Sequence, residues 1–249
     1  FIYWNKSNFF EFTSILGVEL FFVLSGFVLA SQLFKLESDP RKNLKIFLLR
    51  RWIRTIPPYL VALTCAAIVY DYGDKINFIK FLTYTQNILS DNSTPNFFSV
   101  AWSLSVEEWF YILLPLTILI GTKLKIKTFS LNLVNICVVT IITLNIFRLY
   151  YNSIDVNWGE DIRRSVLLRL DSLCFGVIAY SIKDKIKLHY VYLLIILTAT
   201  PLIYLTTKPL LISNSLLFQN LFIPLCSICF SSILIALTFI NSTSKILKK

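Results

Sequence analysis

Long apolar runs alternate with shorter polar segments along the chain. Seven runs hold roughly 20 residues each, enough to cross a hydrocarbon core of about 30 Å as a helix. Helices are expected because lipid offers no hydrogen-bond partner to a free backbone amide. The pattern predicts an all-α fold, a polytopic transmembrane helix bundle forming one domain over residues 1–249. The seven expected spans are Ile15–Phe34, Ile53–Tyr70, Phe97–Ile120, Phe129–Tyr151, Ser165–Ile182, Tyr190–Thr206 and Leu216–Ile240.

Lysine and arginine are divided unevenly between the polar segments. Sixteen lie in segments 35–54, 123–127, 183–187 and 245–249, and six lie in the alternate segments 1–14, 71–96, 152–164 and 207–215. Because short cytoplasmic loops are enriched in basic residues, we expect residues 1–14 to face outward and Lys249 to face inward. The net charge of +10 is then mostly a topology signal. We expect the lipid bilayer as a partner and no nucleic acid.

Composition agrees with a membrane protein. Hydrophobic residues make up 56% of the chain and the mean hydropathy is +0.68, more than a soluble domain of this size needs. All five cysteines lie in expected spans, so we interpret the C-x-x-C spacing of Cys226 and Cys229 as packing rather than redox or metal chemistry.

The chain starts at Phe1, contains no Met and begins on the expected outer side. We therefore expect a further helix upstream of Phe1.

Six charged residues lie inside the expected spans: Glu19, Glu107, Glu108, Arg148, Arg169 and Asp171. A charge at the middle of a membrane is costly and needs a partner or a wet cavity. Glu19 and Arg148 lie near the outer ends of their spans, where we expect them to reach the interface.

Glu107 and Glu108 lie about ten residues into their span, about 15 Å at helical rise and therefore near mid-membrane. We expect one carboxylate to face a polar interior and the other to brace a neighbouring helix. A purely structural role for both remains an alternative. Arg169 and Asp171 would point to opposite faces of a helix, so each needs a partner on another helix. A substrate contact and a structural ion pair are both open for them.

Arg50, Arg51 and Arg54 lie at the expected cytoplasmic start of the second span, and Pro57 and Pro58 follow them. The prolines predict a break or kink in the helix. The arginines can bind phosphates bidentately or can anchor the chain at lipid headgroups. From the residues alone, the anchoring role is favoured.

Two further features are interpreted without catalytic chemistry. Ser25 and Gly26 in GVELFFVLSGFVLA are small, so they predict a close approach of two helices. His189, the single histidine, lies in a basic inner loop and is expected at the membrane interface.

Four stretches together resemble the acyltransferase-3 family of integral-membrane acyltransferases. GVELFFVLSGFVLA is similar to its G-V-D-L-F-F-V-L-S-G-F motif, with Glu19 in place of Asp. RRWIRTIPPY is similar to its arginine-rich segment, and WSLSVEEWFYILLP to its W-S-L-S-x-E-x-x-F-Y block, with Trp109 where Gln is frequent. RLDSLCFG is similar to its R-x-D-x-x-x-x-G motif. The four occur in the family's order from Gly17 to about Ala179.

The resemblance implies transfer of an acyl group, often acetyl, from cytoplasmic acyl-CoA to a hydroxyl of a saccharide or another envelope acceptor. Acetyl-CoA would be the donor substrate, no cofactor would be bound, and the protein would lie in the bacterial inner membrane. It also implies a helix before Phe1 that carries an Arg and a catalytic His, and further helices after Lys249.

The resemblance also assigns roles to this chain's residues. Arg50, Arg51 and Arg54 would hold the donor phosphates. One of Glu107 and Glu108 would orient the expected His or pair with Arg169, and Arg169 and Asp171 would contact substrate. The competing class is a transporter or flippase without acyl chemistry, because charges within spans mark substrate paths there too.

Overall fold

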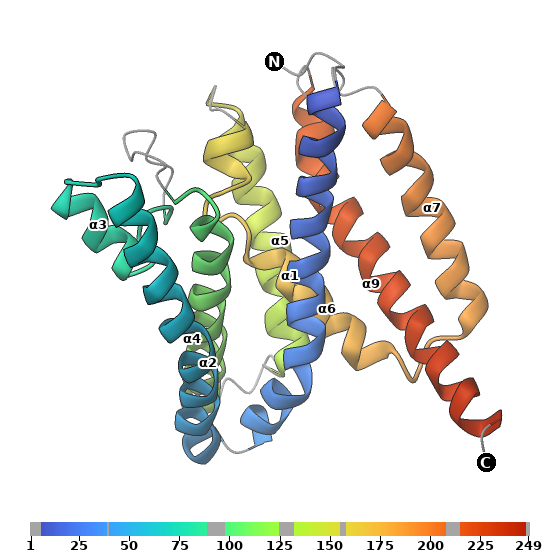
Figure 1. The fold of residues 1–249 in the computed structure, drawn as a ribbon. Coiled ribbons are helices and arrows are strands. Elements are labelled where there is room, and N and C mark those ends of the chain that lie inside the picture. The colour runs from blue at the N-terminus through green and yellow to red at the C-terminus, as the bar shows by residue number, and fades with distance from the viewer. Residues whose placement is uncertain are drawn as a thin grey trace. The chain divides into compact units, whose positions relative to one another are not determined.

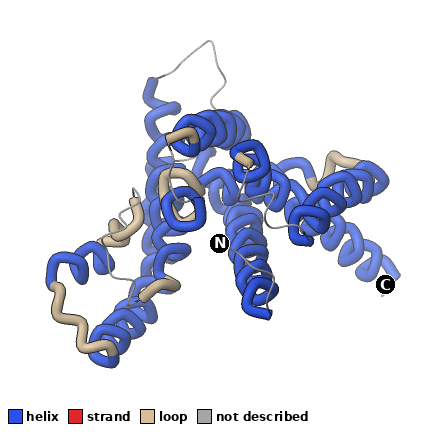
Figure 2. The backbone as a smooth tube through the Cα atoms, turned by 90° about the horizontal axis from the view of Figure 1, so that it is seen from above, coloured by secondary structure: helices blue, strands red, loops and turns tan. Residues whose placement is uncertain are grey.

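The computed structural model describes residues 6–38, 40–88, 98–124, 132–154, 158–207 and 215–247. The described residues form helices joined by turns, and no strand occurs among them (Figures 1 and 2). This agrees with the predicted all-α fold. The helices are α1 (Lys6–Ser38), α2 (Pro40–Val69), α3 (Lys75–Leu82), α4 (Ala101–Leu124), α5 (Leu133–Asn152), the π-helix η1 (Trp158–Ile162), α6 (Leu170–Ile182), α7 (Leu188–Thr207) and α9 (Leu216–Leu247).

Six helices in the described part of the chain are long and apolar enough to cross a membrane. The candidate spans are Thr13–Leu36, Asn43–Val69, Ala101–Ile120, Leu133–Asn152, Leu188–Thr207 and Leu216–Ile240. The predicted fifth span differs, because its helix α6 has only 13 residues. That is about 20 Å of helix, which is shorter than the hydrocarbon core.

The fifth predicted span begins later than expected because residues 163–169 form turns. Within these turns the Val166 amide donates to the carbonyl of Asn87 at 2.8 Å, which is a loop contact and not a helical one. The Arg169 amide donates to the Val166 carbonyl at 3.2 Å, in a tight turn. The apolar sequence from Ser165 onward therefore describes a buried turn and then a short helix.

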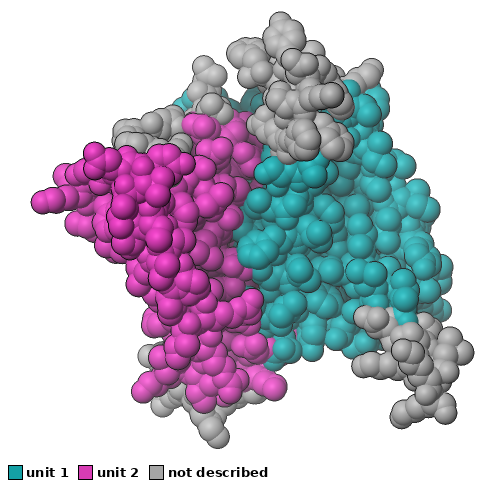
Figure 3. Space-filling model, viewed as in Figure 1, with its two compact units in different colours: residues 1–31, 137–154, 171–249 teal, residues 32–136, 155–170 magenta. Residues whose placement is uncertain are grey.

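The chain divides into two compact units (Figure 3). Unit 1 contains residues 1–31, 137–154 and 171–249, and unit 2 contains residues 32–136 and 155–170. The expectation of one membrane domain over 1–249 stays a prediction.

In unit 1, α1 and α6 approach each other at two glycines. A Cβ placed on Gly26 would lie 2.0 Å from the Leu173 carbonyl oxygen, and one on Gly176 would lie 2.0 Å from that of Val23. The backbones are therefore in direct contact, and the close approach predicted for Gly26 is confirmed. α7 packs against α9, and residues of α6, α7 and α9 share a small core of Ala179, Val191, Ile235 and Ala236.

In unit 2, α2 packs against α4. Tyr59 joins α2 to α3, because its hydroxyl donates to the Phe81 carbonyl at 2.8 Å and its ring stacks on Tyr84 at 4.5 Å. α2 is helical through Pro57 and Pro58, so the helix does not break there, and the alternative of a kink stays a prediction. Both prolines are exposed on the helix surface. Spanning helices tolerate prolines, because neighbouring groups can satisfy the backbone carbonyls that a proline leaves without a hydrogen bond.

Candidate functional site

The three arginines of α2 do not share one environment. Arg50 and Arg54 are exposed, whereas Arg51 is 9% exposed. The guanidinium of Arg51 lies over the ring of Tyr111 on α4, 5.7 Å from its centroid. The sequence predicted that the three arginines act together. In the structure Arg51 faces inward, whereas Arg50 and Arg54 face outward.

Glu108 joins α4 to α2. Its side chain is 2% exposed, and its Oε1 accepts a hydrogen bond of 2.6 Å from the Thr55 hydroxyl. The Trp52 side chain lies near the same carboxylate. Glu108 therefore fits the expectation that one member of the pair braces a neighbouring helix.

Glu107 lies in a different setting on the same helix. It is 5% exposed and lies beside the Tyr111 side chain, one turn further along α4. The positive charge of Arg51 acts on both carboxylates. Arg51, Thr55, Glu107, Glu108 and Tyr111 thus form one buried polar group between α2 and α4, which we call the Glu-pair cluster.

The depth of the Glu pair differs from the prediction. α4 begins at Ala101 and not near Phe97, so Glu107 and Glu108 lie six and seven residues into the helix. At about 1.5 Å per residue this is about 9–10 Å from its start. The pair therefore lies about 5–6 Å on the predicted outer side of the middle of a hydrocarbon core of about 30 Å, and still nearer to the middle than to the end of the span.

Asp171 and Arg169 lie in separate units. Asp171 Oδ2 forms an ion pair of 2.6 Å with Arg148 Nη2 inside unit 1, and both side chains are fully buried. Arg169 is fully buried in unit 2, in the turn before α6 and not on a helix. The ion pair supports the structural alternative for Asp171, whereas the substrate contacts of both residues stay predictions.

Two expectations about the ends of spans were wrong. Arg148 is 0% exposed and Glu19 is 1% exposed, so neither reaches an interface. Arg148 is held by Asp171, and Glu19 Oε2 accepts a hydrogen bond of 3.3 Å from Ser172. The sequence indicated where these two residues lie along their helices. It could not indicate which neighbouring helices cover their side chains.

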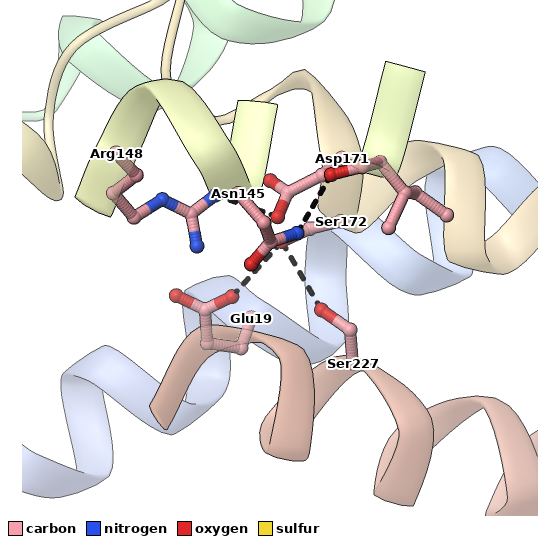
Figure 4. Close-up of polar contacts among 7 residues, drawn as sticks. Glu19, Asn145, Arg148, Asp171, Ser172 and Ser227 are labelled. Carbon is pink, nitrogen blue, oxygen red and sulfur yellow. Dashed lines mark hydrogen bonds and ion pairs between the residues drawn. The ribbon is translucent and has the colours of Figure 1, made fainter. Parts of the chain in front are cut away.

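Four helices of unit 1 bring these groups together (Figure 4). The Ser227 hydroxyl of α9 donates to Ser172 of α6 at 3.2 Å, and Ser172 donates to Glu19 of α1. α5 supplies Arg148, at the left of the view, and Asn145, at its centre. This second buried polar group ties α1, α5, α6 and α9 to one another.

Several residues of these groups were missed from the sequence. Tyr111 could have been found, because it follows Glu107 by four positions and therefore shares its helix face. Thr55, Ser172 and Ser227 carry no such signal, since their partners lie on other helices. No group of three or more His, Cys, Asp or Glu side chains suited to a metal ion occurs among the described residues, and Cys226 and Cys229 are buried in α9.

Comparison with known proteins agrees with these motifs. The model of the acyltransferase-3 family, described as an acyltransferase domain, matches residues 1–248. The ORF330 protein of Acidianus two-tailed virus, named for an inferred acetyltransferase activity, is 35% identical over 105 residues. That match covers 41% of this chain and 30% of the viral protein.

A second relative is the peptidoglycan O-acetyltransferase OatA of Listeria monocytogenes serovar 1/2a. It is 28% identical over 137 residues, which are 48% of this chain and 21% of OatA. The chain thus matches less than a third of the length of either relative. No solved structure matches it significantly. Because the family model covers nearly every residue, the chain belongs to the acyltransferase-3 family of integral-membrane acyltransferases.

Proposed function

We propose that the protein is an O-acyltransferase that moves an acetyl group from cytoplasmic acetyl-CoA to a hydroxyl of a saccharide of the cell envelope, in the bacterial inner membrane. Family membership supports acyl transfer. The names of the two relatives support acetyl as the group, and that of OatA supports an envelope saccharide as the acceptor.

The observation that carries the proposal is the Glu-pair cluster. Two adjacent carboxylates and a guanidinium are buried together between two spanning helices. Buried ionisable groups in membranes are expensive and are usually retained for function. In a site of low dielectric, their electrostatic effect on a reacting group is also stronger than in water.

The reaction itself needs a base and a place for charge. The acceptor hydroxyl attacks the thioester carbonyl, a C–O bond forms, the C–S bond breaks, and CoA leaves as a thiol with the hydroxyl proton. Glu108 is held by α2, so we assign it to positioning. Glu107 is buried beside Tyr111 and within the field of the Arg51 guanidinium. We assign Glu107 to supporting the proton transfer, by orienting or charge-stabilising the base.

The donor is assigned to the exposed arginines of α2. Arg50 and Arg54 lie one turn apart, where both guanidinium groups can reach the phosphates of acetyl-CoA bidentately. Arg51 is turned toward Tyr111 and the Glu pair. Its role is therefore to hold the charge balance of the cluster and not to bind phosphate.

Labelled acetyl-CoA, given to membranes that carry the full protein and the envelope saccharide, tests the proposal. We expect Glu107→Gln to lower kcat by roughly 10²–10³, and the Arg50→Gln/Arg54→Gln variant to raise mainly the KM for acetyl-CoA. Lys45→Gln is the matched control, because it removes an exposed charge of the same helix. Full activity of both Glu107→Gln and Glu108→Gln would remove the Glu pair from the mechanism.

The same experiment distinguishes an acyltransferase from a transporter or flippase without acyl chemistry. A flippase would bring the saccharide to the outer face without an ester-linked acetyl group, and its activity would not depend on acetyl-CoA. Saccharide movement that continues without the donor would contradict acyl transfer.

A further inference from the structure

Tyr84 has an unusual backbone conformation at the end of α3. Its φ of 56° lies in the left-handed region, which only Asp71 shares among the described residues other than glycine. The Tyr84 amide donates to the Phe81 carbonyl at 3.2 Å, and the Thr85 amide donates to the Lys80 carbonyl at 2.8 Å. Tyr84 therefore occupies the position after a helix end where glycine is usual. A side chain with a Cβ is unfavourable in this conformation, so the presence of a tyrosine needs a reason.

The ring and the backbone of Tyr84 have clear structural partners. The ring stacks on that of Tyr59 of α2, with the two ring centroids 4.5 Å apart. The Tyr84 carbonyl accepts a hydrogen bond of 2.9 Å from the indole Nε1 of Trp109 on α4. These contacts join the residue to both α2 and α4. A phenylalanine would make all of them, because none involves the hydroxyl group.

The Tyr84 hydroxyl is the part of the side chain that these contacts do not explain. The residue as a whole is half-buried, but its Oη is buried and has no hydrogen-bond partner among the described residues. A buried polar group without a partner destabilises a fold, and each one in a native protein calls for an explanation. Burial and the negative charge of Glu108 raise the pKa of the Tyr84 phenol. The group therefore stays protonated at neutral pH and can donate a hydrogen bond.

Tyr84 lies beside the Glu-pair cluster. Trp109, whose indole holds the Tyr84 carbonyl, follows Glu108 directly on α4, and the Glu108 charge acts on the Tyr84 phenol. Tyr84 belongs to segment 71–96, which the distribution of basic residues predicts to face outward. In the proposed reaction the envelope saccharide arrives from that side. The hydroxyl thus lies on the side from which the acceptor approaches the Glu pair.

We propose that the Tyr84 hydroxyl binds the acceptor saccharide, by donating a hydrogen bond to an oxygen of the sugar that is acylated. This inference rests on the proposed function, because it names a residue that recognises the acceptor of that reaction. The hydroxyl is covered in this structure, so the acceptor has to uncover it, which lowers the apparent affinity. It lies in the turns of residues 83–88, and such segments open at lower cost than packed helices.

The variant Tyr84→Phe tests the proposal, because it removes the hydroxyl and keeps the ring, the stack on Tyr59 and the carbonyl. The assay follows labelled acetyl transfer from acetyl-CoA in membranes that carry the full protein, with the envelope saccharide fraction added in graded amounts. We expect the KM for the saccharide to rise about twofold to tenfold, the loss expected for one neutral hydrogen bond. The KM for acetyl-CoA should be unchanged, because the donor is assigned to the arginines of α2.

Stability provides a second measurement that does not depend on activity. Tyr84→Phe removes an unfavourable buried group, so unfolding in micelles should require the same or a higher denaturant concentration. Tyr59→Phe is the matched control, because it removes from the other ring of the stack a hydroxyl that donates to the Phe81 carbonyl at 2.8 Å. We expect the control to unfold at a lower denaturant concentration and to keep the KM for the saccharide.

Each outcome decides the inference. A higher saccharide KM in Tyr84→Phe, without loss of stability, would support it. An unchanged saccharide KM would overturn it and leave ordered water as the partner of the hydroxyl, while acetyl transfer by the wild-type protein would still support the proposed function. Lower stability of Tyr84→Phe, or an equal rise in both KM values, would overturn it as well, because the hydroxyl would then serve the fold. No transfer by the wild-type protein would contradict the proposed function itself, and the inference with it.

Discussion

The contact between α1 and α6 makes a sharp prediction about Gly26. An alanine Cβ at this position would lie 2.0 Å from the Leu173 carbonyl oxygen and 2.8 Å from the carbonyl carbon. The first distance is about 1.4 Å closer than the 3.4 Å at which ordinary contact begins. Both obstructing atoms are backbone, so no change of rotamer can relieve the overlap. The two helices must move apart.

The cost follows from what surrounds the contact. Phe22, Val23, Leu173 and Val177 are fully buried beside it, and a separation of about an ångström loses much of the dispersion energy of such a contact. Overpacking a core costs about 1–3 kcal/mol. Because the obstruction is backbone, we expect Gly26→Ala to lie at the upper end of that range, near 3 kcal/mol.

The assay is reversible unfolding in mixed micelles, followed by circular dichroism, with Gly17→Ala as the matched control. Gly17 lies on the same helix, and a Cβ there meets nothing within 4 Å. We expect the control to change the free energy of unfolding by less than about 0.5 kcal/mol. Gly176→Ala should destabilise about as much as Gly26→Ala, and the double variant should cost less than the sum of the two, because both open one interface. Equal stability of Gly26→Ala and Gly17→Ala would refute the close contact.

Three further predictions concern other contacts. Arg148→Ala or Asp171→Ala alone should lower the free energy of unfolding by about 3–5 kcal/mol, because each single change leaves a buried charge unpaired. The double variant Arg148→Met/Asp171→Leu leaves no such charge, so it should keep most of the wild-type stability. Unfolding in micelles measures all three variants, and equal losses in the single and double variants would contradict this prediction. Tyr59→Phe should cost about 1 kcal/mol in the same assay, through loss of the 2.8 Å hydrogen bond to a carbonyl of α3, and an unchanged stability would argue against that bond. The N-cap carboxylate of Asp74 accepts a hydrogen bond from the backbone amide of Asn77, which lowers the pKa of Asp74 in the folded state. The carboxylate should therefore stabilise α3 fully above the pKa that Asp74 has in the unfolded chain. This stabilisation should be lost as the pH falls through the lower pKa of the folded state. Hydrogen-exchange protection of α3 amides, corrected for intrinsic rates, measures this, and Asp74→Asn should remove most of the pH dependence.

Much of the fold could be predicted from hydrophobic pattern alone. Six of the seven expected spans correspond to long helices, because an apolar run of about 20 residues has few alternatives in lipid. The small residue Gly26 also indicated a close helix contact, which the structure places against α6. The start of the fifth span was wrong, because its first residues are apolar but form a buried turn. Hydropathy alone does not distinguish such a turn, which a hydrogen bond to Asn87 holds, from a helix.

The candidate site was only partly predictable. The cost of charge in lipid singled out Glu107, Glu108 and Asp171 correctly as residues that need partners, and the described structure supplies partners for each. The partners themselves could not be inferred. Periodicity gives the helix face on which a residue lies, but not the neighbouring helix that covers this face.

The sequence by itself determined the class of protein, the approximate spans, the expected orientation and the family, because these depend on the solvent and on short contiguous motifs. Tertiary structure alone decided which charges meet. It separated Arg51 from its exposed neighbours Arg50 and Arg54, paired Asp171 with Arg148, and brought Arg163 onto Trp102. The physical reason is that an ion pair or a stacked cation depends on distances of a few ångströms between helices, and those distances result from the packing of whole faces.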